Sequence, residues 1–313
     1  MHSVSARTLD AAGITDPALR AAYERCRRLA SSAGGSYRLA TRLLPREKRP
    51  HVWAVCGFAR RAAGFITSLG ADSMGRQDAG PAGAWAAGIL DALGGAPSDD
   101  PVVPAMLHTM RRWQIPRIHV EAFLDSARAD RAATAYPTYA DLERYLYGSG
   151  AAIGLQLLPI LEPLNPEAAS RARALAEACR LSALIGDIGR DLERGRIYLP
   201  QEDLDTFGVT REALGRGAVT PLIRELIGFE IERARALYAF AEPGVAMLHP
   251  TSRESVRTYG RLCTGTLERI ERAGYQVLTQ RVSVPWQRRW SVALPAMGRA
   301  RAARRAERRW VSA

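Results

Sequence analysis

The chain has 313 residues, of which 47% are hydrophobic and 24% charged, with 27 glycines and 18 prolines. This composition excludes a disordered chain, and the length allows one large domain with a sizeable core. The formal net charge of +12 fits a nucleic acid, a membrane surface or a small anionic substrate, and total charge alone does not distinguish them. The four cysteines lie far apart without a CxxC pair, which argues against a zinc site or a disulfide framework.

The sequence also argues against secretion and membrane insertion. The first residues, MHSVSARTLDAAG, lack the apolar run of a secretion signal. No stretch reaches the roughly 18 uninterrupted apolar residues that a membrane span needs. We therefore expect a soluble protein in the reducing cytoplasm.

Taken in chain order, the segments between glycine and proline breaks have the length and the pattern of helices. Most are rich in Ala, Leu, Arg and Glu with apolar residues three and four apart, as in residues 174–185. Alternating runs of β-branched residues are hardly visible. The clearest breaks are 80–83, 94–101, 163–166 and 215–221. The sequence therefore predicts an all-α bundle without internal repeats.

The segment LSALIGDIGRDLERGRIYLPQEDL, residues 181–204, carries the most informative pair of residues. Asp187 and Asp191 are four apart on a helical segment, so both carboxylates lie on one face. Neighbouring carboxylates repel each other, and a divalent cation, most simply Mg²⁺, offsets that repulsion. Spacing alone leaves a second interpretation open, a surface pair balanced by Arg190 and Arg194.

The whole segment resembles the second aspartate-rich signature of squalene and phytoene synthases. The matching residues are Asp187, Asp191, Gly195, Arg196, Tyr198, Leu199 and Pro200. The resemblance continues in GSYRLATRLLPREKRPHVWAVCGFAR (35–60), TYADLERYLYGSGAAIGLQLLP (138–159) and LERIERAGYQVLTQRVSVP (267–285). It implies the isoprenoid synthase helical bundle, in which a central active-site cavity lies between two facing aspartate motifs that hold Mg²⁺ and prenyl diphosphate. We accordingly expect a synthase domain over residues 1–288 and a basic C-terminal tail over 289–313.

The sequence departs from the family pattern where the resemblance places that cavity. The first aspartate-rich motif is replaced by Ala63, Gly64 and Thr67, and no acidic residue occurs between Glu47 and Asp72. Other family residues, three polar side chains around the second motif and a tyrosine near the C-terminal signature, are replaced by Arg180, Ala183, Gly186 and Cys263. Because the scaffold segments survive beside these changes, the pattern favours altered chemistry over loss of function.

These departures suggest an enzyme that ionises one diphosphate. Arg180 lies seven residues before Asp187, about two turns away on the same helix face, and its fixed positive charge could replace a lost metal ion. The alternative is an ordinary surface arginine. We predict an Mg²⁺-dependent prenyltransferase that uses one allylic diphosphate, farnesyl diphosphate, with a small aromatic acceptor beside Ala63, Thr67 and Ala183. In lacking the first motif, the chain resembles phytoene-synthase-like aromatic prenyltransferases. That resemblance implies indole C3 of a tryptophan-containing cyclic dipeptide as the acceptor.

The resemblance also assigns further site residues. It makes Asp187 and Asp191 the metal ligands and catalytic residues together with Tyr198, and Arg180 joins the catalytic set because of its charge and position. Around the substrate it places Ser36, Tyr37, Arg60, Ala63, Thr67, Tyr145, Tyr147, Ala183, Cys263 and Arg281. The tyrosines would stabilise a carbocation through their ring faces, although ordinary helix packing explains each of them equally well. Asp130 matches an acidic family position, and no general base is identifiable.

Two rival functions remain open at this point. The first is ordinary head-to-head squalene or phytoene synthesis, and the second is a catalytically silent partner that binds prenyl diphosphate. The tail from Arg288 to Arg309, with Trp286, Trp290 and Trp310 interleaved, fits either peripheral contact with anionic lipid or a solvated basic end. We expect no nucleic-acid partner.

Overall fold

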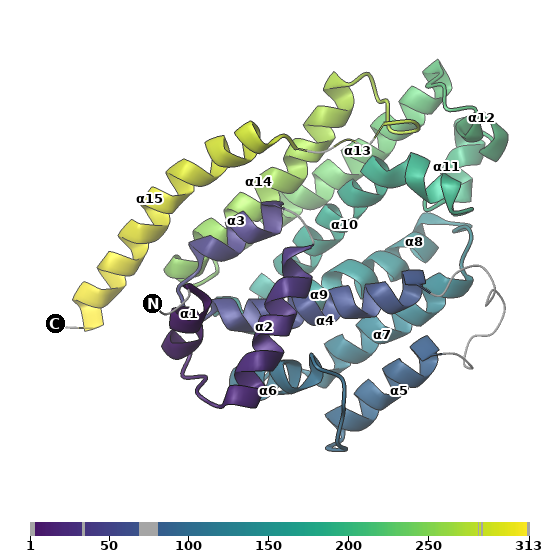
Figure 1. Cartoon of the computed structure of the whole chain (residues 1–313). Helices are drawn as coiled ribbons and strands as arrows, with labels where there is room; N and C mark the ends of the chain where they lie inside the picture. Colours follow the sequence, from purple (N-terminus) through teal and green to yellow (C-terminus); the bar gives the residue numbers. More distant parts are fainter. Residues whose placement is uncertain (1–3, 33–34, 69–80, 281, 283, 312–313) are drawn as a thin grey trace.

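A computed structural model describes residues 4–32, 35–68, 81–280, 282 and 284–311. The N-terminal half contains α1 (Val4–Ala11), α2 (Pro17–Ser31), α3 (Gly35–Leu43), α4 (Arg49–Ser68), α5 (Pro81–Leu93), α6 (Val103–Trp113), α7 (Arg117–Ala132), α8 (Tyr139–Leu146) and α9 (Ala152–Leu157). The C-terminal half contains α10 (Ala168–Glu193), α11 (Gln201–Thr206), α12 (Arg211–Gly215), α13 (Pro221–Ala241), α14 (Pro250–Arg272) and α15 (Trp286–Val311) (Figure 1). A π-helical turn at Tyr147–Ala151 joins α8 to α9, and single 3₁₀ turns lie at Pro159–Leu161 and Glu242–Val245.

The all-α prediction is confirmed, and local sequence explains where several helices begin. Asp16 accepts a hydrogen bond from the Leu19 amide at the start of α2, and Thr138 forms a capping box with Asp141 at the start of α8. The breaks at 94–101, 163–166 and 215–221 fall between helices. Within the described residues, strand-like pairing is limited to two isolated bridges, Tyr136 with Pro200 and Pro163 with Leu248.

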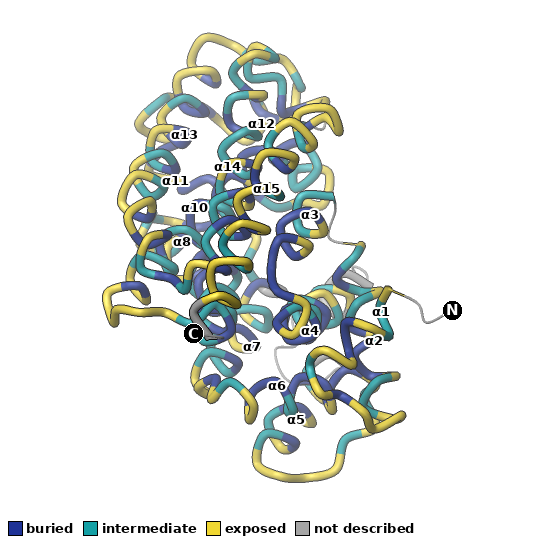
Figure 2. The backbone as a smooth tube through the Cα atoms, turned by 90° about the vertical axis from the view of Figure 1, so that its left-hand side faces the viewer, coloured by how far each residue is buried: buried dark blue, intermediate teal, exposed yellow. Residues whose placement is uncertain are grey.

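The buried apolar side chains form two large clusters. The first is built mainly from α2, α4, α5, α6 and α7 and includes Tyr23, Phe58 and Leu124. The second is built mainly from α8, α10, α13 and α14 and includes Leu142, Ile185 and Ile227. Figure 2 shows the buried positions of both groups as dark segments along the inner faces of the helices. The two long helices α4 and α10 therefore belong to different clusters.

Two glycines allow close approaches that fix these helices. A Cβ atom at Gly57 of α4 would lie 2.6 Å from the backbone of Cys26 in α2. A Cβ atom at Gly189 of α10 would lie 2.0 Å from the carbonyl oxygen of Leu278, and the Gly189 amide donates to the Val277 carbonyl at 3.1 Å. The segment before α15 therefore crosses the C-terminal half of α10, next to the acidic pair.

The basic C-terminal segment is helical and packed against the bundle. Ala293, Ala296 and Ala300 are buried on one side of α15, and the latter two pack against Leu43 of α3. The helix begins at Trp286, so the division expected at residue 288 lies within its first turn. Across the part of the chain that the structure describes, every helix is too short or too polar to cross a membrane.

Candidate active site

The two aspartates of α10 lie in different environments. The Asp187 side chain is 38% exposed and pairs with Arg190 at 3.3 Å, whereas the Asp191 side chain is 13% exposed and lies 4.0 Å from Arg194. Loss of hydration and the negative charge of Asp187 raise the pKa of Asp191 to about 6. The surface-pair interpretation therefore describes Asp187 better than Asp191, which is more buried and whose ion pair, with Arg194, is longer at 4.0 Å.

This donor set fits a magnesium ion with few protein ligands. Mg²⁺ commonly takes one or two carboxylates and completes its shell with water and substrate phosphate oxygens. Asp187 and Asp191 offer two hard oxygen donors whose mutual repulsion a cation relieves. Among the described residues, no group of three or more His, Cys, Asp or Glu side chains is arranged to hold a metal.

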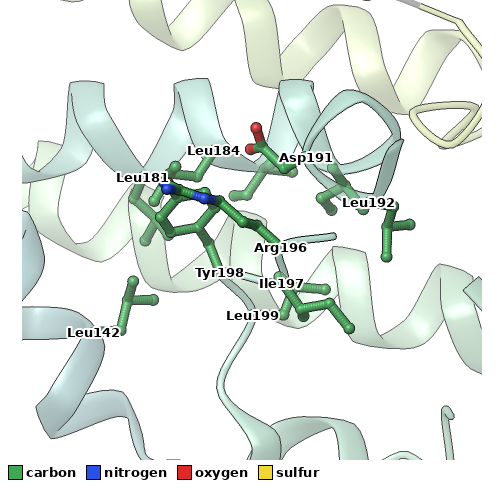
Figure 3. Close-up of a pocket in the computed structure, with 11 residues that line it drawn as sticks. Leu142, Leu181, Leu184, Asp191, Leu192, Arg196, Ile197, Tyr198 and Leu199 are labelled. Atoms are coloured by element: carbon green, nitrogen blue, oxygen red, sulfur yellow. The ribbon is translucent and has the colours of Figure 1, made fainter. Parts of the chain in front are cut away.

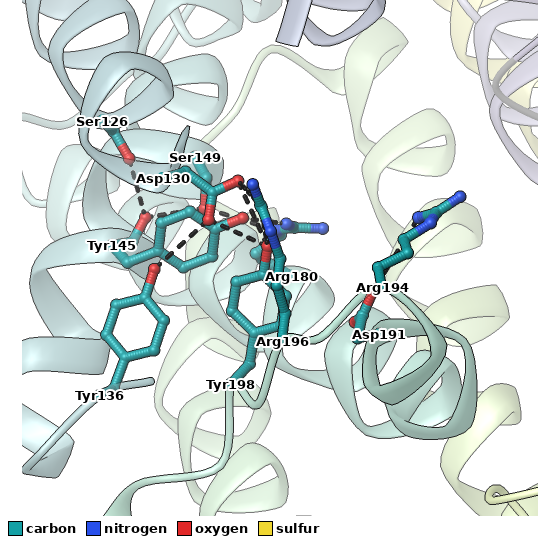
Figure 4. Close-up of polar contacts among 10 residues, drawn as sticks. All are labelled: Ser126, Asp130, Tyr136, Tyr145, Ser149, Arg180, Asp191, Arg194, Arg196 and Tyr198. Carbon is teal, nitrogen blue, oxygen red and sulfur yellow. Dashed lines mark hydrogen bonds and ion pairs between the residues drawn. The ribbon is translucent and has the colours of Figure 1, made fainter. Parts of the chain in front are cut away.

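Arg180 lies in a cluster of tyrosines two turns before the acidic pair. Its guanidinium carbon lies 5.2 Å from the centre of the Tyr145 ring, and it donates hydrogen bonds to the Tyr145 hydroxyl and, at 3.3 Å, to Ser149 Oγ (Figure 4). The rings of Tyr145 and Tyr198 stack with centroids 5.2 Å apart, and Tyr136 lies against both at 5.5 and 5.7 Å. Arg180 therefore points into a polar aromatic cluster rather than into solvent.

Asp130 of α7 anchors the other side of this cluster. Its carboxylate accepts hydrogen bonds from Arg196 Nη1 at 2.9 Å and from the Tyr198 hydroxyl at 2.9 Å, with the Tyr136 hydroxyl farther away at 3.4 Å. Burial alone would lower the pKa of Arg180, but Tyr145, Tyr198 and Asp130 outweigh burial and raise it. The Arg180 guanidinium is therefore held charged and fixed in place.

The π-helical turn between α8 and α9 explains why Tyr145 and Ser149 reach Arg180. A Cβ atom at Gly148 would lie 2.1 Å from Ser126 Cβ, and one at Gly150 would lie 3.0 Å from Arg180 Cβ. A side chain at Gly148 would clash with α7, and one at Gly150 would make a very tight contact with α10. The irregular turn thus places the end of α8 directly against α10, in line with the use of such turns at functional sites.

A small hollow opens beside Asp191. Its polar lining consists of Asp191, Arg196 and Tyr198, and the remaining side chains are apolar (Figure 3). The apolar lining residues are Leu142, Leu181, Leu184, Ile185, Ile188, Leu192, Ile197 and Leu199. Its free space is that of about one water molecule, so this hollow as it stands does not hold a prenyl chain.

Thiols and phenols form a second group between the two core clusters. The Cys179 thiol of α10 contacts the Cys263 thiol of α14, and this hydrogen bond together with burial raises the pKa of Cys179 well above its usual range. Burial raises the pKa of Cys56 to about 12, with Tyr37 as its hydrogen-bonding neighbour. Tyr259 is 38% exposed, yet the neighbouring Cys263 and poor hydration raise its pKa strongly. These side chains are partly accessible but poorly hydrated, as expected for the wall of a site that takes an apolar ligand.

The structure brings some of the predicted site residues together and leaves others apart. Arg180, Tyr145 and Tyr198 share one cluster, and Tyr37 and Cys263 share the group of thiols and phenols. The others lie separately: Ser36 is half-buried at the start of α3, Arg60 is exposed and Ala63 half-buried on α4, Ala183 is exposed on α10, and the Tyr147 ring stacks under Arg173 at 5.2 Å. The side chain of Thr67 and all of Arg281 lie outside the described residues.

Sequence reasoning missed several members of the site. Asp130 was recognised only as a family position, and Ser149, Tyr136 and Cys179 were not singled out. Ser149 is the one that a sequence signal could have indicated, because glycines on both sides of it mark a bend between two helical segments. The roles of the other three depend on contacts between distant segments.

Comparison with known proteins identifies the class of this chain. Residues 30–289 match the squalene/phytoene synthase family. The chain is 32% identical over 287 residues to the phytoene synthase of Arthrospira platensis, a match that covers 87% of this chain and 92% of the relative. It is 30% identical over 283 residues to 15-cis-phytoene synthase of Synechococcus elongatus, covering 87% and 91%.

Solved structures agree with these matches. A dehydrosqualene synthase superposes with a TM-score of 0.81 at 24% identity, covering 91% of this chain and 98% of that one. Squalene synthase HpnC of Alicyclobacillus acidocaldarius superposes with a TM-score of 0.74 at 28% identity, covering 85% and 98%. The chain belongs to the squalene/phytoene synthase family and has the all-α isoprenoid synthase fold, and the members named here are enzymes.

These matches overturn one functional prediction. Transfer of a single farnesyl group to an aromatic acceptor, with indole of a cyclic dipeptide as the best candidate, is wrong, because the similar proteins are phytoene, squalene and dehydrosqualene synthases. The prediction rested on a few missing acidic residues in one helix. The similarity extends over almost the whole chain and favours the head-to-head alternative.

Proposed function

We propose that this protein joins two allylic prenyl diphosphates head to head, as a transferase of the phytoene and squalene synthase class. The observation that carries the proposal is the carboxylate pair of α10, in which Asp191 is poorly hydrated, two turns from a fixed arginine in a chain similar to phytoene synthases over 287 residues. Four unpaired cysteines support a reducing location, the cytoplasm.

Diphosphate departure needs positive charge where the leaving group becomes more negative. Asp187 and Asp191 would hold Mg²⁺, which supplies Lewis-acid stabilisation of the diphosphate oxygens when it is bound. Arg180 adds a charge that cannot swing away, because Tyr145 and Ser149 hold its guanidinium. Arg180 lies close enough to Asp191 that its positive charge offsets part of the rise in the pKa of Asp191.

The allylic cation left behind needs electron-rich, poorly nucleophilic surroundings. The stacked faces of Tyr136, Tyr145 and Tyr198 provide such surroundings close to Arg180. Burial raises the pKa of Tyr198 far above its usual range, and its hydroxyl is held by Asp130 at 2.9 Å and by Arg196 at 3.1 Å. Tyr37 and Cys263 would line the room for the prenyl chains.

The remaining assignments are also part of the proposal. Ser36, Arg60 and Arg281 are proposed to bind the diphosphate, Tyr147 to stabilise the allylic cation with the other tyrosines, and Ala63, Thr67 and Ala183 to contact the substrate. Residues 1–288 would suffice for the reaction.

A second candidate is a protein that binds prenyl diphosphate without turning it over. It is favoured by α4, where no aspartate or glutamate occurs from Arg49 to Ser68 although the family resemblance places an acidic motif there. Such a chain would bind the diphosphate through α10 alone.

The test is incubation of the purified protein with Mg²⁺ and either farnesyl or geranylgeranyl diphosphate, followed by pyrophosphate assay and product mass spectrometry. A hydrocarbon, or a cyclopropyl diphosphate, that contains two prenyl units supports head-to-head joining. Tight binding of the diphosphate without pyrophosphate release supports the silent partner and rejects the main proposal. Loss of a product in Asp187→Asn shows that the product comes from this site.

A further inference from the structure

The exposed flank of α15 begins with apolar side chains. Trp286, Trp290 and Leu294 are spaced by four residues and are 65%, 37% and 59% exposed. A different side of the helix, with Ala296 and Ala300, is the one that packs against Leu43. Packing within the chain therefore does not account for two tryptophans and a leucine at the surface of one helix.

Arginines continue the same flank along the second half of α15. With 3.6 residues per turn, Arg301, Arg305 and Arg308 follow Leu294 on that side. The helix carries eight arginines against a single acidic residue, Glu307. Two of the eight, Arg288 and Arg299, pair with Glu268 at 3.5 Å and Glu254 at 2.8 Å on α14.

The fold adds a second segment to this basic surface. Arg304 donates to the Leu43 carbonyl at 2.7 Å, which holds α15 against the end of α3. Just after the turn between α3 and α4, Arg49 donates to the carbonyls of Leu44 at 2.9 Å and Arg42 at 2.7 Å. Positive charges are thus gathered from two segments about 260 residues apart in sequence.

Burial and crowding lower the pKa of two of these arginines. Burial, followed by the charges of Arg304 and Arg46, lowers the pKa of Arg49 to about 10. Burial and the neighbouring Arg301 lower the pKa of Arg304. An anion placed on this surface would relieve that repulsion.

We propose that α15 and the α3–α4 turn form a docking surface for an anionic lipid bilayer. Trp286, Trp290 and Leu294 would enter the headgroup region, and the arginines would contact lipid phosphates. A nucleic acid would satisfy the arginines but would gain little from an exposed leucine beside two tryptophans. The apolar half of the flank therefore selects the membrane.

The position of α15 gives this docking a consequence for the site. The chain that leads into it passes Gly189 of α10, and Val284 packs 3.7 Å from the position of a Cβ atom at Gly265 of α14. A docked α15 would hold the acidic pair near the bilayer, where apolar substrates and products partition. This consequence rests on the proposed function, whereas the docking surface itself does not.

The test is flotation of the full chain, without substrate, with vesicles of phosphatidylcholine alone or with about 30% phosphatidylglycerol. We expect binding to the anionic vesicles and its loss at high salt. Trp290→Ser/Leu294→Ser and Arg301→Glu/Arg305→Glu should each reduce the partition coefficient by about tenfold or more. Unchanged thermal melting would show that both variants are folded.

Matched controls separate this surface from general stickiness and charge. Ile118→Asn/Leu164→Gln changes two apolar residues of α7 and a loop that are 63% and 61% exposed. Arg25→Glu/Arg216→Glu makes the same change in net charge on α2 and just after α12. Both controls should bind like the parent chain. Equal binding to neutral vesicles, equal loss in the controls, or binding of a single-stranded oligonucleotide without vesicle binding would each overturn the proposal.

Discussion

The helices α4 and α10 show how packing and chemistry separate in this fold. Both are long, and each is held by a glycine that permits a close backbone approach, Gly57 in α4 and Gly189 in α10. α10 carries Asp187 and Asp191, whereas α4 has no acidic residue from Arg49 to Ser68. A packing face can therefore be kept in a helix that has no carboxylates, and the residues that we propose to hold a metal lie on α10.

The largest expected effect is on α10. We expect Asp191→Asn to reduce Mg²⁺-dependent pyrophosphate release by about 100-fold or more, because it removes one of the two carboxylates that we propose as metal ligands. Steady-state assay with farnesyl or geranylgeranyl diphosphate measures this effect. Glu193→Gln, two residues away and exposed, is the matched control and should keep full activity. An active Asp191→Asn variant would show that the pair does not hold the metal.

Two alanine substitutions on α4 test how closely this helix packs against α2. Gly57→Ala would press a methyl group against the Cys26 backbone and should destabilise the fold by about 2–3 kcal/mol. Gly64→Ala meets no atom of the described residues within 4 Å and should stabilise the helix by about 1 kcal/mol. Urea unfolding of both variants measures the difference. Equal effects would mean that α2 and α4 do not approach as closely as the structure shows.

Arg180 adds a positive charge to α10 two turns before its carboxylates, whereas α4 differs by its lack of carboxylates. We expect Arg180→Gln to lower kcat about tenfold, and Arg180→Lys to recover part of the loss since it keeps the charge without the fork geometry. Measuring the unfolding free energy alongside kcat separates chemistry from stability. If Lys and Gln reduce kcat equally while both fold normally, the charge of Arg180 is not what the reaction uses.

The smallest expected effect is on stability, whose pH dependence has opposite signs at His51 of α4 and Asp191 of α10. On α4, burial and the neighbouring His108 lower the pKa of His51 to about 3, so the unfolded chain takes up a proton first and stability falls as the pH drops below the ordinary histidine value. On α10, the pKa of Asp191 is raised to about 6, so the folded chain takes up a proton first and stability rises as the pH drops through that value.

Urea unfolding at pH 7 and about pH 6 measures both effects. His51→Gln should remove a loss of about 1 kcal/mol on acidification. Asp191→Asn should be more stable than the parent chain at neutral pH without Mg²⁺, with the difference shrinking toward acid. A constant difference for either variant would contradict the corresponding pKa shift.

The sequence by itself determined the helical class, several of the breaks between helices and the family. Periodicity of 3.6 residues, capping residues and the spacing of Asp187 and Asp191 are local properties, so they can be read without the fold. The same local reading failed on the reaction, because a few missing acids in α4 carried more weight than the similarity of the whole chain.

Only the tertiary structure decided what each side chain meets. Asp187 and Asp191 are equivalent by spacing, yet one is 38% and the other 13% exposed, because neighbouring segments cover the turn that carries Asp191 more than the turn that carries Asp187. Asp130 joins Arg196 across 66 residues, and α15 reaches Leu43 across 261. Burial and charge at a site depend on contacts between distant segments, and the pattern within a single helix does not contain them.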